Sequence, residues 1–254
     1  MIGGMAVEIE GQGEPLVMIH GLGGTSNVFT PQMALLASRM RVIRPDLPGS
    51  GRSPVRGTPT IAHFVDRLLG LMAELDINQA HIAGHSLGSM VALHAAAAQP
   101  ALVKSLVLLG PFLAPPESAR AALRDRAAKA RVAGMQPIAD AIVQGSTAAA
   151  TRRDRPVVLA LIREMLMRQD PEGYALTCEA LAAADAPDIG AIKCRTLLIA
   201  GDEDSVAPAG GARDIAGRMA DARLTVLAQS GHWMSLEKAA DVTDALREIY
   251  FGRA

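Results

Sequence analysis

Aromatic side chains, cysteines and unbalanced charge are all scarce in this sequence of 254 residues. Phe, Trp and Tyr make up 3% of the chain, so a wide binding site built on stacked rings is not expected. The two cysteines match no metal-binding or redox spacing, and we expect both to be small buried side chains without a disulfide. The net charge of −1 gives no electrostatic attraction to nucleic acid or to an anionic membrane.

Long apolar runs are absent as well. No stretch approaches the ~20 residues that span a bilayer, and residues 1–10 lack the basic start and apolar centre of a signal peptide. We therefore expect a cytoplasmic protein. What the chain does contain is a hydrophobic share of 50% against 20% charged residues, which is enough for one large buried core.

The most informative motif is GHSLG at residues 84–88. It follows a short apolar run and precedes SMVALHAAAA, a sequence that favours helix. A serine between two glycines at such a junction is typical of a nucleophile elbow, a turn so tight that the flanking positions lack side chains. The start of the following helix also directs partial positive charge toward an oxyanion. Ser86 is therefore the predicted nucleophile, and Ser89 is expected to pack against the helix.

Two later loops carry the partners that a nucleophilic serine needs. Asp204 follows the apolar segment TLLIA at 196–200, and His232 follows RLTVL at 223–227. A histidine in this role takes the hydroxyl proton, and a carboxylate holds the histidine in the correct tautomer. Asp202 and Glu203 lie in the same loop as Asp204 and compete with it for the role of the acid.

The chain resembles the α/β-hydrolase fold family over its whole length. The resemblance is carried by the order serine, acid, histidine and by three further motifs: HGLGG at 20–24, DLPGSGRS at 46–53 and SGHW at 230–233. The family pattern G-x-x-D-x-x-x-P favours Asp204 over Asp202 as the acid. The resemblance also implies an oxyanion hole made by the backbone N–H groups of Leu22 and Leu87. The DLPGSGRS turn is expected to be structural, because Asp, Arg and Ser in a tight Gly/Pro turn hydrogen-bond one another.

Alternating apolar runs and helical patterns predict an α/β fold, with a mostly parallel central sheet flanked by helices. One of these helices is expected to start near Thr58 and Pro59. The alternation stops between about residues 111 and 190, where the sequence is helical, rich in Ala and Arg, and broken by prolines. The resemblance implies that this segment is an all-helical cap inserted after the sixth strand. We expect a core of residues 1–110, a cap of residues 111–190, and the remainder of the core in residues 191–254.

The substrate pocket is less clearly marked in the sequence. Its expected contributors are Gly21, Phe29, His85, Phe112, Met135 and Trp233. Arginines of the cap offer a bidentate partner for a substrate carboxylate, although a solvated helix face explains each of them equally well. These arginines are Arg152, Arg153, Arg155, Arg163 and Arg168.

The resemblance implies a serine hydrolase that cleaves a small ester or lactone through an acyl-enzyme, without a metal or an organic cofactor. The cap segments RVAGMQPIADA at 131–141 and DPEGYA at 170–175 look most like those of 3-oxoadipate enol-lactonases. A general carboxylesterase, a carbon–carbon bond hydrolase and a perhydrolase are alternatives that use the same triad. A ligand-binding receptor of the same fold is the non-enzymatic alternative. We expect a small-molecule substrate and no nucleic-acid or membrane partner; the oligomeric state stays open.

Overall fold

The computed structural model describes residues 1–55 and 57–252. A seven-stranded sheet in the order β1-β3-β2-β4-β5-β6-β7 forms its centre. β1 runs antiparallel to β3, and all other neighbouring pairs are parallel. The prediction of an α/β fold with a mostly parallel sheet is therefore confirmed. The strands are β1 Val7–Glu10, β2 Glu14–Ile19, β3 Met40–Pro45, β4 Ala80–His85, β5 Val103–Leu109, β6 Arg195–Gly201 and β7 Ala222–Leu227.

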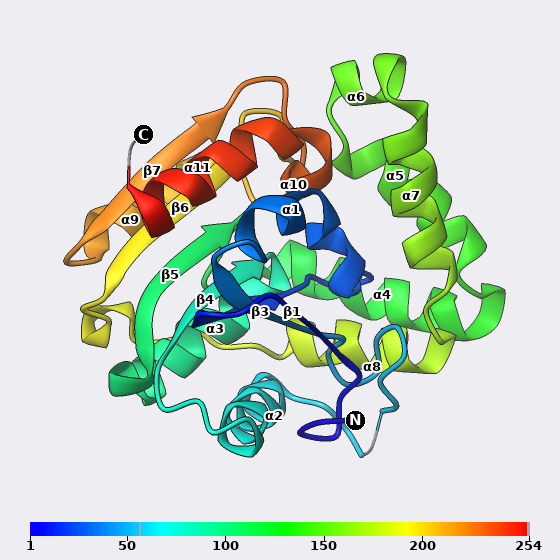
Figure 1. Ribbon diagram of the computed structural model, residues 1–254. Coiled ribbons are helices and arrows are strands. Elements are labelled where there is room, and N and C mark those ends of the chain that lie inside the picture. Colours follow the sequence, from blue (N-terminus) through cyan, green and yellow to red (C-terminus); the bar gives the residue numbers. More distant parts are fainter. Residues whose placement is uncertain (56, 253–254) are drawn as a thin grey trace.

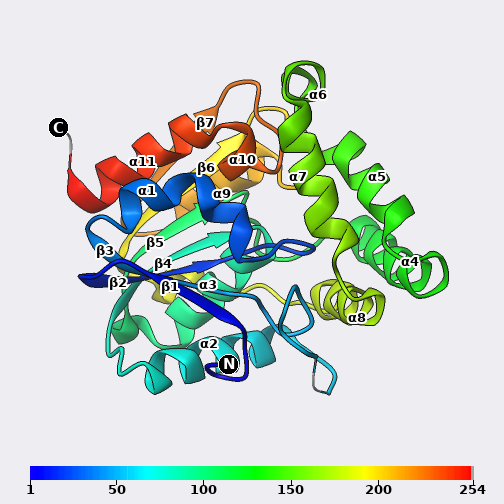
Figure 2. The same cartoon turned by 45° about the vertical axis from the view of Figure 1, so that its right-hand side comes forward.

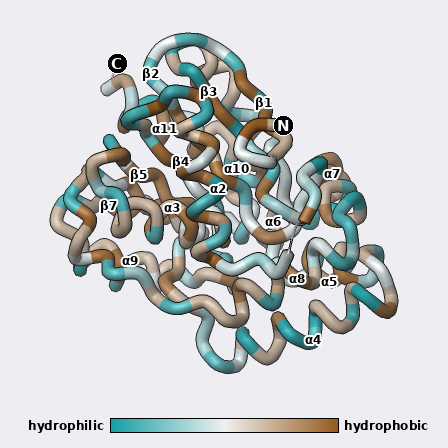
Figure 3. The backbone as a smooth tube through the Cα atoms, turned by 90° about the horizontal axis from the view of Figure 1, so that it is seen from below, coloured by the Kyte–Doolittle hydropathy of each residue, from teal (hydrophilic) through white to brown (hydrophobic). Residues whose placement is uncertain are grey.

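Helices cover both faces of the sheet. α1 (Met33–Leu36) and α11 (Ala239–Phe251) lie on one face, and α2 (Ile61–Glu74) and α3 (Leu87–Ala98) lie on the other (Figure 1; Figure 2). Because both faces are covered, the central strands carry continuous apolar runs, such as LVMI in β2 and LVLL in β5, instead of alternating. In Figure 3 the central strands are mostly brown, which marks hydrophobic residues, whereas teal and brown residues alternate along an outer helix. Within the described ranges, no helix is both long and apolar enough to cross a membrane.

Five helices lie between β5 and β6, at the right of Figure 1. Three of them, α5, α7 and α8, have a proline at the first or second helical position, where it removes no internal hydrogen bond. α2, by contrast, begins slightly later than predicted, because Thr60 provides its N-terminal cap by accepting a hydrogen bond from His63 N–H (3.1 Å). The five helices are α4 Glu117–Ala133, α5 Gln136–Ser146, α6 Ala149–Asp154, α7 Pro156–Met167 and α8 Pro171–Ala182.

This helical insertion follows the fifth strand, and the prediction that it follows the sixth was wrong. Among the described residues only β1 precedes β2, and the residues before β1 fold back through a bridge between Ile2 and Met5. The sequence VEIE of β1 is half charged and none of its residues is buried, so no apolar run marks it as a strand.

The chain order of the strands creates a crevice at one edge of the sheet. From β2 the chain moves outward to β3 and then returns to the opposite side of β2 to form β4. Loops that leave the carboxyl ends of parallel strands diverge at such a point. Ile19 of β2 pairs with Gly84 of β4, so the HGLGG loop and the GHSLG turn leave the sheet side by side. β6 and β7 end at the same edge, before α9 (Ala209–Arg218) and α10 (Met234–Glu237).

Candidate active site

Ser86 lies in a strained turn between β4 and α3. Its backbone has φ 54° and ψ −116°, a conformation that residues with a Cβ rarely adopt. The turn is held by a hydrogen bond from Ser86 N–H to Leu109 O (2.8 Å). A Cβ on Gly84 would lie 2.3 Å from Gly88 O, and a Cβ on Gly88 would lie 2.1 Å from Ile19 O. Both positions therefore require glycine.

The two serines of this region have different surroundings. Ser89 is fully buried, and its Oγ donates to Gly84 O (2.7 Å). Ser86 Oγ makes no hydrogen bond within the described part of the chain, and Ser86 lines a cavity of about 860 Å³. The same cavity is lined by Leu22, His232 and Trp233, together with residues of the helical insertion. We call this space the Ser86 cavity.

His232 and Asp204 form a buried pair beside the Ser86 cavity. His232 Nδ1 lies 2.8 Å from Asp204 Oδ2. Asp204 Oδ1 accepts from the N–H groups of Val206 and Ala207, both at 2.9 Å. If Nδ1–H donates to the carboxylate, the neutral ring keeps Nε2 unprotonated and able to accept a proton. Gly110 makes room for the pair, since a Cβ there would lie 3.1 Å from the His232 ring.

Asp204 stays ionised although it is buried. Burial by itself raises its pKa, but the charge and hydrogen bond of His232 and the two backbone N–H groups together lower the pKa below its ordinary value. The neighbouring acids Asp202 and Glu203 are exposed, and each accepts a backbone N–H elsewhere, at 3.1 and 2.7 Å. Of the three acids in this loop, Asp204 is the one that contacts His232.

Two backbone N–H groups next to Ser86 have no hydrogen-bond partner among the described residues. One belongs to Leu87, the first residue of α3, where the helix leaves its N–H donors unsatisfied. The other belongs to Leu22, which follows Gly21; a Cβ on Gly21 would lie 2.9 Å from Ser86 Cβ. The main chain at Leu22 thus passes directly beside the serine. Unpaired N–H donors in this position are suited to bind an oxyanion.

His20 holds the loop that contains Leu22. Its Nδ1 lies 2.8 Å from Gly21 O, and its Nε2 lies 2.8 Å from Leu47 N. Because a carbonyl only accepts and an amide N–H only donates, the ring carries its proton on Nδ1. Burial is the main cause that lowers the pKa of His20, so the ring stays neutral.

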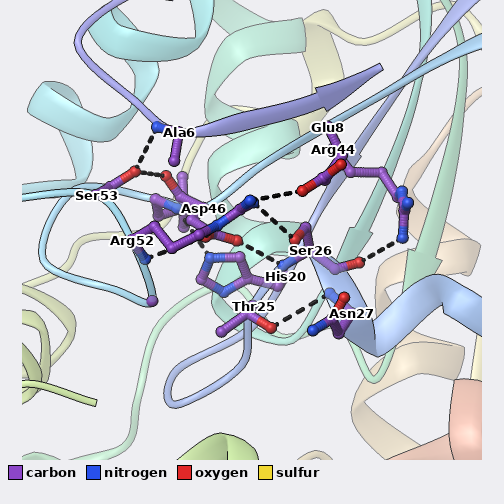
Figure 4. Close-up of polar contacts among 12 residues, drawn as sticks. Ala6, Glu8, His20, Thr25, Ser26, Asn27, Arg44, Asp46, Arg52 and Ser53 are labelled. Carbon is purple, nitrogen blue, oxygen red and sulfur yellow. Dashed lines mark hydrogen bonds and ion pairs between the residues drawn. The ribbon is translucent and has the colours of Figure 1, made fainter. Parts of the chain in front are cut away.

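The DLPGSGRS turn is held by hydrogen bonds among its own side chains and neighbouring backbone (Figure 4). Asp46 accepts from Ser26 N–H (2.8 Å) and from Arg52 Nε (2.9 Å). Ser53 Oγ donates to Asp46 O (2.6 Å) and accepts from Ala6 N–H (2.8 Å). The turn therefore ties the end of β3 to the neighbouring segments, in line with the structural role predicted for it.

His85 does not line the Ser86 cavity, contrary to its prediction as a substrate-binding residue. Its ring is buried against the rings of His232 and Trp233, with centroids 4.8 and 5.6 Å away. Its Nε2 donates to the main-chain oxygen of His232 (2.8 Å). Burial, followed by repulsion from His232, lowers the pKa of His85 to about 3. The neutral ring therefore supports the loop of His232 by this hydrogen bond, without lining the cavity.

The other predicted pocket residues divide into two groups. Phe112 and Trp233 line the Ser86 cavity, and Gly21 lies beside Ser86 without lining it. Phe29, in the 3₁₀ helix Ser26–Gln32, and Met135, directly before α5, do not line the cavity, so the prediction was wrong for both. Both side chains pack in the core, and local sequence does not specify the direction in which they turn.

The five arginines expected to offer a carboxylate partner do not line the Ser86 cavity. Three of them form ion pairs with acids of the insertion, and two donate to main-chain oxygens. The basic residues that do line it are Arg126 and Lys129 of α4. The three ion pairs are Arg153 with Asp154, Arg163 with Asp140, and Arg168 with Glu164.

Two residues outside the predicted site hold the loop of His232. Ser146 O accepts from His232 N–H (2.7 Å), and Ser146 Oγ accepts from the Trp233 indole (3.0 Å). Glu237 is 1% exposed, and its Oε1 accepts from Trp233 N–H (3.0 Å). Glu237 follows His232 closely in sequence and is a recognisable position. Ser146 comes from the distant helical insertion and has no sequence signal.

Glu237 also binds the helical insertion. Its Oε2 accepts from Ala148 N–H (2.7 Å) and from Thr151 Oγ1 (2.8 Å). One buried carboxylate thus receives hydrogen bonds from the His232 loop and from the start of α6. A neutral amide offers one accepting oxygen where the site presents donors to both oxygens, so it leaves a buried donor unpaired.

Glu237→Gln is therefore expected to destabilise the fold by about 2–3 kcal/mol. This corresponds to a fall in Tm of roughly 4–12 °C for a chain of this size, measured by differential scanning calorimetry. Glu203→Gln is the matched control, because Glu203 accepts from the adjacent Ala149 N–H but is exposed. Its Tm should stay close to that of the wild type. Equal Tm losses in the two variants would contradict the importance of burial.

The protein is also expected to lose stability as the pH falls below neutrality. The pKa of His85 is lowered from 6.5 to about 3, and that of His20 is lowered as well. Below about pH 6.5 the unfolded chain binds protons at both residues while the folded chain does not, so the free energy of unfolding decreases toward pH 3. Tm should fall from about pH 8 to about pH 4. The fall should persist in His63→Gln and become shallower in His85→Asn; a constant Tm would contradict the prediction.

Comparison with known proteins agrees with this architecture. The family model described as alpha/beta hydrolase fold matches residues 14–154. The chain is 33% identical over 251 residues to a pimeloyl-[acyl-carrier protein] methyl ester esterase of Chromobacterium violaceum, with 95% of this chain and 96% of that one covered.

Two solved structures are similar over nearly the whole chain. The enol-lactonase from Burkholderia xenovorans LB400 has 31% identity and a TM-score of 0.89, with 96% of this chain and 95% of that one covered. A thermophilic esterase from Thermogutta terrifontis has 28% identity and a TM-score of 0.91, with coverages of 96% and 92%. Together with the sheet order and the turn at Ser86, these matches show that the chain belongs to the α/β-hydrolase fold family.

Proposed function

We propose that this protein hydrolyses a small ester or lactone through a covalent acyl intermediate on Ser86. One observation carries the proposal: Ser86, with an unbonded hydroxyl, shares a cavity with His232, whose Nδ1 contacts the buried carboxylate of Asp204. Serine, histidine and carboxylate in this relation are the groups of an acyl-transfer triad. The strained turn holds the hydroxyl at the cavity wall, where a substrate carbonyl can approach it.

In the proposed mechanism, His232 Nε2 takes the proton from Ser86 Oγ as the oxygen attacks the carbonyl carbon. The resulting oxyanion accepts hydrogen bonds from the N–H groups of Leu22 and Leu87. His232 gives the proton to the leaving oxygen as the carbon–oxygen bond breaks. It then deprotonates the water that attacks the acyl carbon and returns the proton to Ser86 Oγ as the acid leaves. Side chains and water account for every proton, so the scheme needs no cofactor.

We further propose that residues 111–190 act as a cap over this site. Residues of α4, α5 and α8 line the Ser86 cavity, so access to Ser86 depends on how these helices pack. Ser146 also connects the insertion to the loop of His232. The core that carries the triad would then consist of residues 1–110 and 191–254.

For the substrate, an enol-lactone such as 3-oxoadipate enol-lactone is the first candidate, and a simple carboxylic ester is the second. The relatives favour both classes, since one is an enol-lactonase and others are esterases. The size of the cavity, about 860 Å³, accommodates either.

The test is to measure kcat/KM for 3-oxoadipate enol-lactone and for a series of short 4-nitrophenyl esters. A value above ~10⁵ M⁻¹s⁻¹ for the lactone would support the lactonase. A value below ~10² M⁻¹s⁻¹ with rapid ester turnover would support the carboxylesterase instead. Labelling of Ser86 by a fluorophosphonate, located by mass spectrometry, tests the nucleophile independently of the substrate. Turnover far below ~1 s⁻¹ on all these compounds without labelling would favour the ligand-binding receptor.

A further inference from the structure

The walls of the Ser86 cavity are mostly apolar, but one region, formed by α4 and α8, is not. Arg126 and Lys129 line the cavity from α4, and Tyr174 lines it from α8. Arg126 is half-buried, whereas Lys129 is exposed at the rim. This region was not predicted from the sequence.

The hydroxyl of Tyr174 is buried without a hydrogen bond. The residue is 1% exposed, and its hydroxyl oxygen has no partner within the described ranges. Burial, followed by the neighbouring Cys178, raises the pKa of Tyr174 well above its ordinary value, and nearby Arg126 offsets this only in part. The group is therefore a neutral hydroxyl with a free donor. Buried polar groups in native proteins normally have partners, so this donor points to a ligand.

The Tyr174 ring lies beside the loop that contains Leu22. A Cβ on Gly23 would lie 3.2 Å from Tyr174 Cε2, the ring carbon next to the one that carries the hydroxyl. Gly23 directly follows Leu22, which lines the cavity beside Ser86. Tyr174 thus lines the cavity next to the loop that would bind the oxyanion, and Arg126 lines the same cavity from α4.

Arg126 and Lys129 have no ion-pair partner among the described residues, and in this they differ from Arg124 and Arg131 of the same helix. Arg124, on the same helix, pairs with Glu117, and Arg131 pairs with two glutamates. Asp125 also lines the cavity, but it forms no ion pair with Lys129 or Arg126. The cavity wall therefore carries more positive than negative charge, and the Arg126 guanidinium, which forms no ion pair, lies beside the Tyr174 hydroxyl.

We propose that Arg126 and Tyr174, assisted by Lys129, form a subsite that binds a carboxylate of the substrate. The substrate would then be an ester or lactone whose acyl part carries a free carboxylate at its far end. The guanidinium provides charge-assisted hydrogen bonds, and the hydroxyl donates a further one. This inference rests on the proposed function, because it assigns the acyl chain to the space between Ser86 and Arg126.

The test compares two substrates that differ only in the distal carboxylate: mono-4-nitrophenyl adipate and 4-nitrophenyl hexanoate. In the wild type, kcat/KM should be about tenfold or more higher for the adipate ester. Arg126→Gln and Tyr174→Phe should each lower kcat/KM for the adipate ester by about tenfold and change the hexanoate ester less than about twofold. Tyr174→Phe removes a hydroxyl without a hydrogen-bond partner, so its folding should be unaffected.

Arg124→Gln is the matched control, since it removes the same charge from α4 at an exposed residue outside the cavity wall. Both esters should keep their wild-type kcat/KM in this variant within about twofold. Equal losses on both esters in Arg126→Gln and Tyr174→Phe, or no wild-type preference for the adipate ester, would overturn the subsite while leaving the hydrolase intact.

A binding measurement separates this inference from the proposed mechanism. Monomethyl adipate and dimethyl adipate are titrated into Ser86→Ala protein, with fluorescence of Trp233, the single tryptophan, as the signal. The monoester should bind more tightly than the diester, and Arg126→Gln in this background should raise its Kd by about tenfold. If neither nitrophenyl ester is hydrolysed but this preference is found, the function fails and the subsite stands. Equal binding of the two adipates overturns the subsite.

Discussion

Ser86→Ala is expected to lower kcat by about 10⁴–10⁶ while leaving the fold unchanged, by analogy with the loss of triad residues in subtilisin. The loss is large because the neighbouring serine cannot take its place: Ser89 is buried and donates to Gly84 O. The fold should be retained because Ser86 Oγ has no hydrogen bond to lose within the described residues. Alanine also tolerates the strained φ of 54° about as well as serine. The measurement is kcat on the best ester together with Tm.

Ser89→Ala is the control for Ser86→Ala. It should retain most of the activity but lose about 1 kcal/mol of stability, because Gly84 O loses its side-chain donor. The reverse pattern, with activity lost at Ser89 and kept at Ser86, would disprove the assignment of the nucleophile.

Asp204→Asn is expected to lower kcat by about 10³–10⁴ with a small effect on KM. The N–H groups of Val206 and Ala207 both point at Oδ1, so the amide oxygen of Asn would occupy that position. Its NH₂ would then face His232 Nδ1 and force the ring to accept there. Nε2 would carry the proton and could no longer take one from Ser86. The measurement is kcat in single-turnover and steady-state assays.

Asp202→Asn tests whether this effect is specific to Asp204. Both residues are aspartates of one loop, but Asp202 is exposed and accepts only Ser230 N–H (3.1 Å). Its substitution should change kcat by less than about threefold. A loss at Asp202 as large as that at Asp204 would show that loop structure, and not the His232 tautomer, controls the rate.

Features that depend on local geometry could be predicted from the sequence. The elbow is one, since the contacts that exclude a Cβ at Gly84 and Gly88 involve a turn of a few residues and one adjacent strand. The parallel sheet is another, because strands covered on both faces leave continuous apolar runs. β1 could not be predicted in this way, because the edge strand VEIE contains no continuous apolar run.

Features that depend on how helices pack could not be predicted in this way. Phe29 and Arg126 are two examples. Phe29 was expected to line the pocket but is buried elsewhere, whereas Arg126 lines the cavity and was not predicted to do so. Both lie on helices, where a rotation of one residue changes the side that faces the core. Contacts with distant segments, such as that of α4 with α8, decide this rotation.

The sequence by itself indicated the family through its motifs, and it determined the order of the strands that carry the site and the position of Ser86, because short-range sterics and apolar periodicity encode the last two. The tertiary structure decided which residues brace the loop of His232 and which charges line the cavity. The family pattern already favoured Asp204 among the three acids of its loop, and the packing of β6 against β7 brings Asp204 to the ring. Glu237 and Ser146 likewise meet only because the insertion folds back onto the core.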